Sequence, residues 1–258
     1  MKEHIIQKTR RVEEQMARLF CVRKPFSAHL AKWEDDLLPD KYDHNCFEYS
    51  DQPTVKEYEA ALQYQKEKGA TFIKLEGDAP LENPFGLEQS VTATMVLTKH
   101  DAQWKVHPDI IFREPDIAAL EEIEVKHYGP VYGEDFSRRN IRRLYEKLTY
   151  HGAYLADKLV GAGYSFSADG MICVDGLITD TDYRRQYVAT SLLAHIRDLH
   201  PKDTLFLHAD EDDTPKDMYL KMGFEIVDRL YEYTRTGIND YLKLRNVRDK
   251  TQLRADRP

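Results

Sequence analysis

The order of local patterns in the second half of the chain is the feature that most narrows its fold. Two helical patterns, at 117–126 and 137–148, come first. Three closely spaced strand-like segments follow, near 152–156, 159–166 and 171–179, and an Asp-Gly hairpin signal separates the last two. The chain then alternates helix, strand, helix and strand, at 185–199, 204–209, 216–222 and 224–233. This order predicts an α/β (α+β) domain with a mixed central sheet flanked by helices.

The first half of the chain predicts a smaller α/β domain. A helical pattern up to about residue 19 leads into an irregular stretch, and Thr54 and Glu57 then form a capping box that opens a helix ending at Gly69. Strand-like segments lie near 45–49, 70–76 and 91–98. The extended segment 104–115 contains two prolines, so the predicted boundary falls there. The predicted parts are an N-terminal domain at 1–107, a second domain at 108–236 and a polar tail at 237–258.

Composition excludes several classes of function. The formal net charge is −8, with 45 acidic and 37 basic residues, which argues against a nucleic-acid-binding surface. No apolar run is long enough to cross a bilayer, and the N-terminus lacks the apolar core of a signal peptide. Cys21, Cys46 and Cys173 have neither pairing nor metal-ligand spacing. We therefore expect a cytoplasmic protein with free thiols, no membrane partner and no metal.

The turn before the long helix carries the main chemical signal. Helix N-termini leave backbone N–H groups unpaired and carry partial positive charge, so a diphosphate placed there finds donors aimed at it. Arg184 and Arg185 would add mobile positive charge to the same phosphates. An ordinary solvated helix start with two surface arginines would have the same sequence.

Two motifs together resemble the GNAT superfamily of acyl-CoA-dependent N-acyltransferases. The family's Arg/Gln-x-x-Gly-x-Gly/Ala turn is matched in part by Arg184-Arg185-Gln186-Tyr187-Val188-Ala189, in which Tyr187 replaces the first glycine. The family's Leu-Tyr-x-x-x-Gly-Phe motif is matched by Met218 to Phe224. The resemblance covers about half of the chain. It implies a GNAT fold, preceded here by the smaller α/β domain, and acetyl-CoA as co-substrate.

The resemblance also implies roles for particular residues. Acetyl-CoA would contact the phosphate turn through residues 184–190, namely Arg184, Arg185, Gln186, Tyr187, Val188, Ala189 and Thr190. A backbone N–H within Leu177, Ile178 or Thr179 would stabilise the thioester oxygen. Tyr219 occupies the position of the tyrosine that protonates the departing thiolate, although it could also simply pack against the sheet.

The general base stays open at this stage. Some family members use a glutamate on the strand before the phosphate turn, where this chain has Cys173. Strand alternation places Asp175 on the same face as Cys173, which makes Asp175 a candidate. His208, Asp210 and Glu211 are comparable candidates, and a chain of ordered waters could serve instead. The acidic run 210–213 would favour a cationic amine if it lies near the substrate.

The resulting prediction is an enzyme, an N-acetyltransferase that transfers an acetyl group from acetyl-CoA to a primary amine of a small molecule or peptide. The alternative is a catalytically silent GNAT module that binds acyl-CoA or a protein partner. The N-terminal half could be a degenerate GNAT-like copy, could shape the substrate site or could form the interface of a homodimer.

Overall fold

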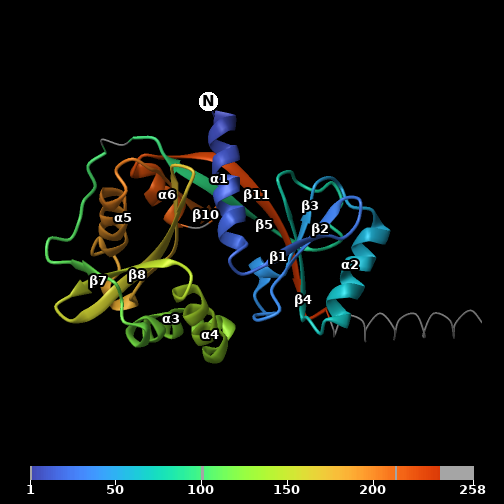
Figure 1. Ribbon diagram of the computed structural model, residues 1–258, viewed down its shortest axis with the longest axis horizontal. Coiled ribbons are helices and arrows are strands. Elements are labelled where there is room, and N and C mark those ends of the chain that lie inside the picture. The colour runs from blue at the N-terminus through green and yellow to red at the C-terminus, as the bar shows by residue number, and fades with distance from the viewer. Residues whose placement is uncertain (1, 100–101, 213, 239–258) are drawn as a thin grey trace, which may run out of the picture. The chain divides into compact units, whose positions relative to one another are not determined.

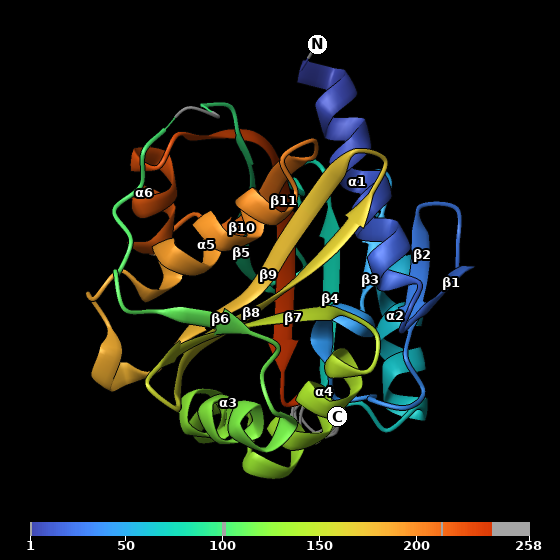
Figure 2. The same cartoon turned by 60° about the vertical axis from the view of Figure 1, so that its left-hand side comes forward.

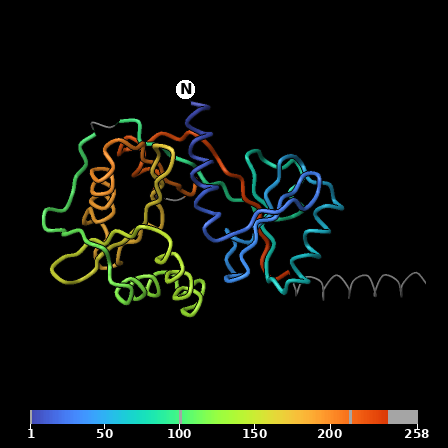
Figure 3. The backbone as a smooth tube through the Cα atoms, in the orientation of Figure 1, coloured from blue at the N-terminus to red at the C-terminus, as the bar shows by residue number. Residues whose placement is uncertain are grey.

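The computed structural model describes residues 2–99, 102–212 and 214–238 (Figure 1). The chain divides into two compact units, and each is formed by two separate stretches of sequence. Unit 1 contains residues 1–19 and 93–228, and unit 2 contains residues 20–92 and 229–258. The chain passes from one unit to the other within two long strands, β5 (Glu88–Leu97) and β11 (Phe224–Thr236), so both strands contribute residues to both units (Figure 3).

Unit 1 has the element order that the sequence predicts for the second half of the chain. Helix α1 (Lys2–Ala17) belongs to it as well. Its further helices are α3 (Ile117–Tyr132), α4 (Glu134–Tyr145), α5 (Val188–Leu199) and α6 (Thr214–Lys221). Its further strands are β6 (Ile111–Arg113), β7 (Thr149–Leu155), β8 (Lys158–Ala168), β9 (Met171–Thr179) and β10 (Thr204–Asp210). The short 3-10 helix η2 (Thr181–Tyr183) lies between β9 and α5.

The sheet of unit 1 is mixed. Its strand order is β11-β5-β10-β9-β8-β7-β6. Strands β6, β7, β8 and β9 pair antiparallel with one another, whereas β10 runs parallel to β9 after the crossover through α5. Figure 2 shows the three-strand meander β7-β8-β9 with α3 and α5 close to it. The predicted fold class, a mixed sheet flanked by helices, is confirmed.

Two irregularities in β9 open the sheet at its centre. Ala162 of β8 pairs with Ile178, but Tyr164 pairs with Asp175, so Gly163 alone faces the two residues Gly176 and Leu177. This is a β-bulge, which leaves a residue unpaired and bends its strand. The pairs between β9 and β10 end at Val174 and Leu207, although both strands continue beyond them. The two parallel strands therefore separate next to the bulge.

The two faces of this sheet are covered by different helices. On one face, α5 and α6 enclose Ile172, Val174 and Leu207 in an apolar cluster that also contains Tyr219 and Phe224. On the other face, Val12 of α1 packs with Cys173 and Phe206, and Figure 2 shows α1 beside β8 and β9. Alternation along each strand separates the two sets of side chains.

Unit 2 repeats part of the same topology. Strands β1 (Val22–Pro25), β2 (Leu30–Glu34) and β3 (Phe47–Tyr49) form an antiparallel meander, and η1 (Tyr42–His44) lies between β2 and β3. Helix α2 (Val55–Glu67) then crosses to β4 (Phe72–Gly77), which pairs parallel to β3. The order of strands is β1-β2-β3-β4-β11-β5. Three antiparallel strands, a helix and a parallel strand thus occur in both units.

Most predicted elements are present, with three differences. The predicted irregular stretch after residue 19 contains β1 and β2, and the extended segment 104–115 contains β6. The division into compact units does not follow the predicted boundary at 107 and 108, because α1 and half of β5 pack in unit 1 and most of β11 packs in unit 2. Most of the predicted tail, from residue 239 on, lies outside the described residues.

Candidate functional site

The turn between β9 and α5 contains two residues in the left-handed region. Arg185 has φ 63°, and Tyr187, the N-cap of α5, has φ 63° and ψ 19°. L-residues adopt this region at a cost of about 1–2 kcal/mol, which glycine avoids. The backbone at Tyr187 therefore has the conformation that favours glycine, although this chain carries a tyrosine there.

Ion pairs between one buried carboxylate and two half-exposed lysines hold the start of this turn. The Asp180 carboxylate lies 2.5 Å from Lys126 Nζ and 3.2 Å from Lys158 Nζ, and it accepts the Asp182 N–H at 3.1 Å. Burial alone would raise the pKa of Asp180, but these hydrogen bonds and charges lower it to about 2. Asp180 is therefore ionised at neutral pH and orients the turn that follows.

The N-terminus of α5 is open to an anion. No side chain caps α5 among the described residues, and residues 184–187 are exposed. The Arg184 guanidinium lies 3.3 Å from Nδ1 of His127, and the two arginines carry the positive charge of the turn. The first N–H groups of a helix have no intrahelical partner, so those of Val188, Ala189 and Thr190 are the natural donors to a bound diphosphate.

The corresponding helix of unit 2 is closed to an anion. The Thr54 hydroxyl accepts the Glu57 N–H at 3.3 Å, and the Glu57 carboxylate accepts the Thr54 N–H at 2.9 Å. The predicted capping box is thus confirmed. The Thr54 hydroxyl occupies the Glu57 N–H and the Glu57 carboxylate adds negative charge, so of the two crossover helices α2 and α5, α5 is the one without a side-chain cap.

A surface pocket adjoins the turn. Its volume is about 510 Å³, and its lining residues come from α5, α6 and the segment after β5: Gln103, Trp104, Lys105, Tyr187, Thr190, Asp217, Met218, Lys221 and Met222. Lys105 Nζ lies 4.5 Å from the centroid of the Tyr187 ring. Trp104 is fixed by a 2.7 Å hydrogen bond from its indole N–H to the Met222 carbonyl. Positive charge and aromatic surface therefore meet beside the turn.

The bulge in β9 selects one of the three predicted backbone donors. Ile178 and Thr179 both pair with β8, whereas Leu177 lies in the bulge at the point where β9 and β10 have separated. Gly176 beside it has φ 60°. Of the three predicted backbone donors, Leu177 is therefore the one without a register partner on β8.

The predicted acid and base lie on opposite faces of the sheet. Tyr219 is 7% exposed and packs in the cluster beneath α5 and α6, with its ring 5.7 Å from that of Phe224. Asp175 lies on the face that α1 covers, next to the bulge, and accepts a 2.8 Å hydrogen bond from Tyr164 Oη. The two side chains are therefore on either side of the sheet, near the point where β9 and β10 separate.

The other candidate bases have different surroundings. His208 lies 3.3 Å from Glu13 and 3.4 Å from Thr94 Oγ1. Burial opposes a charge on His208, but Glu13 and a hydrogen bond with Cys173 raise its pKa well above the usual value. Burial also raises the pKa of the Cys173 thiol, to about 11.

The acidic run after β10 starts at the end of that strand. Asp210 is exposed and accepts the Asp212 N–H at 2.9 Å, which closes a local turn. Glu211 is partly buried. Asp213 lies outside the described residues.

Several neighbours of the site gave no recognisable signal in the sequence. Lys105, Trp104 and Lys221 reach the pocket from segments on either side of the motifs. Tyr150 and Tyr164 reach Asp175 through strand pairing. A tyrosine or lysine in a strand or loop is common, and only the register of the sheet and the path of the 103–105 segment bring these residues to the site.

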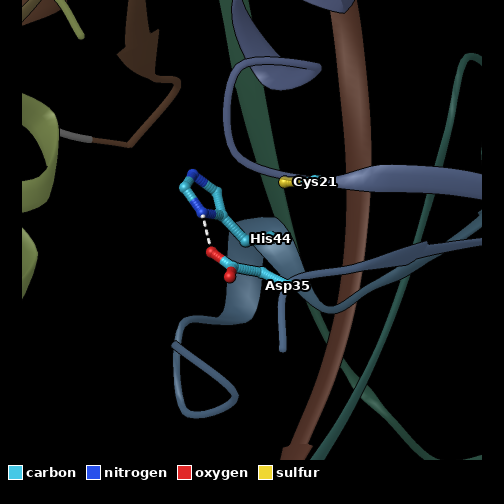
Figure 4. A group of neighbouring side chains, drawn as sticks. All are labelled: Cys21, Asp35 and His44. Carbon is cyan, nitrogen blue, oxygen red and sulfur yellow. Dashed lines mark hydrogen bonds and ion pairs between the residues drawn. The ribbon is translucent and has the colours of Figure 1, made fainter. Parts of the chain in front are cut away.

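One group of metal-ligand types occurs among the described residues, in unit 2. Cys21, Asp35 and His44 are buried, and their ligand atoms all lie within 4.8 Å of one another (Figure 4). His44 Nδ1 lies 2.9 Å from Asp35 Oδ2, while Asp35 Oδ1 accepts the N–H groups of Leu37 and Leu38 at 3.0 and 3.2 Å. These bonds stabilise the turn after β2, which accounts for the Asp35 and His44 side chains without an ion.

No helix in the described part of the chain is both long enough and apolar enough to cross a bilayer.

Comparison with known families identifies the second half of the chain. A family profile described as an acetyltransferase (GNAT) domain matches residues 120–240. The C-terminal half of this protein is therefore a GNAT acetyltransferase domain, as the two motifs predict. No curated protein sequence matches the chain.

Solved structures with the same fold extend over most of the chain. A functionally unknown conserved protein from Staphylococcus epidermidis has 17% identity and a TM-score of 0.72, covering 84% of this chain and 94% of its own. A GCN5-related N-acetyltransferase from Kribbella flavida has 12% identity and a TM-score of 0.62, covering 88% and 94%. A tandem GNAT protein from the clavulanic acid biosynthesis pathway has 13% identity and a TM-score of 0.52, covering 81% and 78%. At these identities the likeness shows the fold alone.

Proposed function

We propose that the domain transfers an acetyl group from acetyl-CoA to a primary amine of a small molecule or peptide. The observation that carries the proposal is the turn before α5. There, a left-handed backbone at Tyr187, an uncapped helix N-terminus and two exposed arginines occur together. This combination supplies donors and positive charge for a diphosphate, which CoA contains.

The pocket beside the turn suits the nucleotide end of the same molecule. Lys105 and Lys221 bring positive charge to it, which suits the 3′-phosphate of CoA. The rings of Trp104 and Tyr187 offer surface for stacking of a base. We assign these four residues to the nucleotide part and residues 184–190 to the diphosphate.

The chain then supplies three functions for the transfer. The amine attacks the thioester carbon, the carbon–sulfur bond breaks, and the sulfur leaves as a thiolate that takes a proton. The N–H of Leu177, with Ile178 and Thr179 beside it, would stabilise the negative charge on the carbonyl oxygen. Tyr219 is the proposed donor of the proton to the thiolate.

Asp175 is the base that we favour. An ammonium acceptor must lose a proton before its nitrogen can attack, and a carboxylate beside the separated strands can receive it. His208 is a poor candidate because it is already paired with Glu13 at 3.3 Å, and Glu13 and Cys173 raise its pKa. Asp175 is held next to the bulge by Tyr164, whereas Asp210 is exposed at the C-terminal end of β10 and accepts the Asp212 N–H of its own turn.

Calorimetric titration with acetyl-CoA tests the cofactor assignment. We expect the wild type to bind at micromolar concentration and the double variant Arg184→Ala, Arg185→Ala to bind at least about tenfold more weakly. The double variant Arg139→Ala, Arg143→Ala on α4 removes the same charge away from the turn and serves as the control. Absence of binding at millimolar acetyl-CoA would reject the enzyme.

Activity separates the enzyme from the silent module. The exposed Tyr187 ring at the phosphate turn and Cys173 at the acidic position favour the silent module as the second candidate. Acetyl transfer to an amine, reduced in Tyr219→Phe while acetyl-CoA binding is kept, would support the enzyme. Binding of acetyl-CoA without transfer to any aliphatic or aromatic amine would support the silent module.

We further propose that unit 2 is a degenerate copy of the same fold. Its three antiparallel strands, crossover helix and parallel strand support this, and one structure of similar fold is a tandem GNAT protein. Because α2 is capped by a carboxylate, unit 2 should not bind acetyl-CoA. The titration should therefore give one site per chain, and a second site that survives the double arginine substitution would reject this proposal.

A further inference from the structure

Three polar side chains form a row across β7, β8 and β9. Tyr150 pairs with Tyr164, and Tyr164 pairs with Asp175, so the three lie side by side on the face that α1 covers. The two ring centroids are 5.4 Å apart, and Tyr164 Oη donates to Asp175 at 2.8 Å. We call these residues the Tyr-Asp row. It ends where β9 and β10 separate, two residues from Leu177.

The hydroxyl at the start of the row is left without a partner. Tyr150 is 5% exposed, and its buried Oη makes no hydrogen bond to any described residue. The nearby Tyr145 is different, because its Oη donates toward Glu114 and the Pro115 carbonyl, each at 3.0 Å. A buried polar atom without a partner is costly, so an unpaired hydroxyl beside a proposed reaction centre points to a ligand that completes it.

The surroundings of this hydroxyl favour a cation. Helix α3 contributes Glu124, which is 7% exposed, and Tyr128. Burial and the charges of Glu124 and Asp175 raise the pKa of Tyr128 to about 12, and the same influences raise the pKa of Tyr150. Two carboxylates and three phenol rings thus act on one small region. Carboxylates attract a positive charge, and ring faces bind it through cation–π contacts.

We infer that the Tyr-Asp row binds the acceptor as an ammonium ion, so that the acceptors are aliphatic primary amines, which are cations at neutral pH. The ammonium donates to the Asp175 carboxylate and to Tyr150 Oη and lies against the Tyr164 ring. Asp175 already accepts hydrogen bonds from Tyr164 Oη and from the Gly176 N–H at 2.7 Å, but it forms no ion pair with a cationic side chain among the described residues. Arylamines, which are neutral at this pH, would not supply a cationic partner. The inference rests on the proposed function for the transfer step, but binding of the cation can be measured without it.

The test uses 1,5-diaminopentane as the probe, titrated into the full chain without acetyl-CoA, with aniline as the uncharged comparison. We expect Tyr150→Phe to weaken diaminopentane binding about tenfold and Asp175→Asn to weaken it more, since hydrogen bonds to a charged group are lost. Tyr150→Phe should leave the melting temperature unchanged or higher, because it removes an unpaired buried oxygen. The control Tyr145→Phe should lower the melting temperature and leave amine binding unchanged.

Two results would overturn the inference. One is binding of aniline as tight as that of diaminopentane. The other is unchanged diaminopentane binding in both Tyr150→Phe and Asp175→Asn while both variants remain folded. Failure of acetyl-CoA to bind would instead reject the proposed function and leave the cation test standing. If transfer occurs, Tyr150→Phe should raise the KM for the amine and leave that for acetyl-CoA unchanged, whereas Asp175→Asn should also lower kcat because Asp175 is the proposed base.

Discussion

The left-handed residue at the start of α5 leads to an unusual prediction, namely that glycine is more stabilising than alanine at this position. Tyr187 has φ 63° and ψ 19°, so any L-residue there is strained, whereas glycine is not. We compare Tyr187→Gly with Tyr187→Ala. Both variants lose the ring and its contact with Lys105 at 4.5 Å, so their difference reports the backbone alone.

The magnitude follows from two opposing costs. Alanine in the left-handed region costs about 1–2 kcal/mol, and the extra freedom of glycine in the unfolded chain costs about 0.5–1 kcal/mol. Tyr187→Gly should therefore be more stable than Tyr187→Ala by about 0.5–1 kcal/mol. In a unit of this size the difference corresponds to a melting temperature higher by about 1–4 °C.

A matched pair of substitutions at Arg139 provides the control. Arg139 is exposed in the interior of α4, in the same unit, where ordinary helix propensity applies. There Arg139→Ala should be more stable than Arg139→Gly by about 1 kcal/mol, which is the opposite order. Thermal and urea unfolding of the four variants measure both differences.

The reasoning fails if the order at Tyr187 is the same as at Arg139. Alanine equal to or better than glycine at position 187 would mean that the turn is not left-handed there. The phosphate turn would then lack the geometry on which the cofactor assignment depends.

Three further predictions concern the rest of the fold. Gly176→Ala should destabilise unit 1 by more than about 2 kcal/mol in urea unfolding, because Gly176 has φ 60° and a Cβ there would lie 2.5 Å from the Tyr164 ring. A neutral effect would contradict the bulge geometry. Lys74→Met should lower the free energy of unfolding by about 3–5 kcal/mol in the same assay. Lys74 is 3% exposed and its Nζ lies 3.2 Å from Glu76 Oε2, so the substitution removes a cationic partner of this carboxylate. His151, whose pKa burial and nearby histidines lower to about 4, should be neutral when folded. Between pH 6.5 and 4 the unfolded state then binds more protons than the folded state. The free energy of unfolding should therefore decrease as the pH is lowered through this range, by less than about 3 kcal/mol. Thermal melts of His151→Gln against pH should lose this part of the slope, and an unchanged slope would refute it.

Local signals in the sequence were sufficient for most elements. The capping box at Thr54 and Glu57 satisfies helix N–H groups within four residues, so it needs no tertiary contact to be recognised. The hairpin at Asp169 and Gly170 is similar, since both residues have positive φ, of 54° and 73°. The two motifs that identify the acetyltransferase domain also lie in short stretches around a helix terminus.

The sequence could not predict the division of the chain into units. Strand β5 comes after the first stretch of unit 2 in the chain, and β11 comes at the end of unit 1, yet each strand contributes residues to the sheets of both units. Pairing between strands more than 100 residues apart depends on the register of backbone hydrogen bonds, which no local pattern encodes. Likewise β1 gives a weak signal in the sequence because it is a short edge strand that contains Pro25, and β2, which lies between β1 and β3, has only five residues.

The candidate site divides in the same way. The sequence alone predicts a helix beginning near this turn, within three residues of the start of α5 at Val188, and it identifies the arginines of the turn and the two motifs, because these depend on neighbours within one turn of helix or one strand. The tertiary structure alone decided that Tyr187 is left-handed, that Leu177 lies in the bulge, and that Tyr150 lies beside Tyr164 and Asp175. A bulge shifts the pairing by one residue and so changes which side chains meet across the sheet, and that shift is a property of three strands packed together.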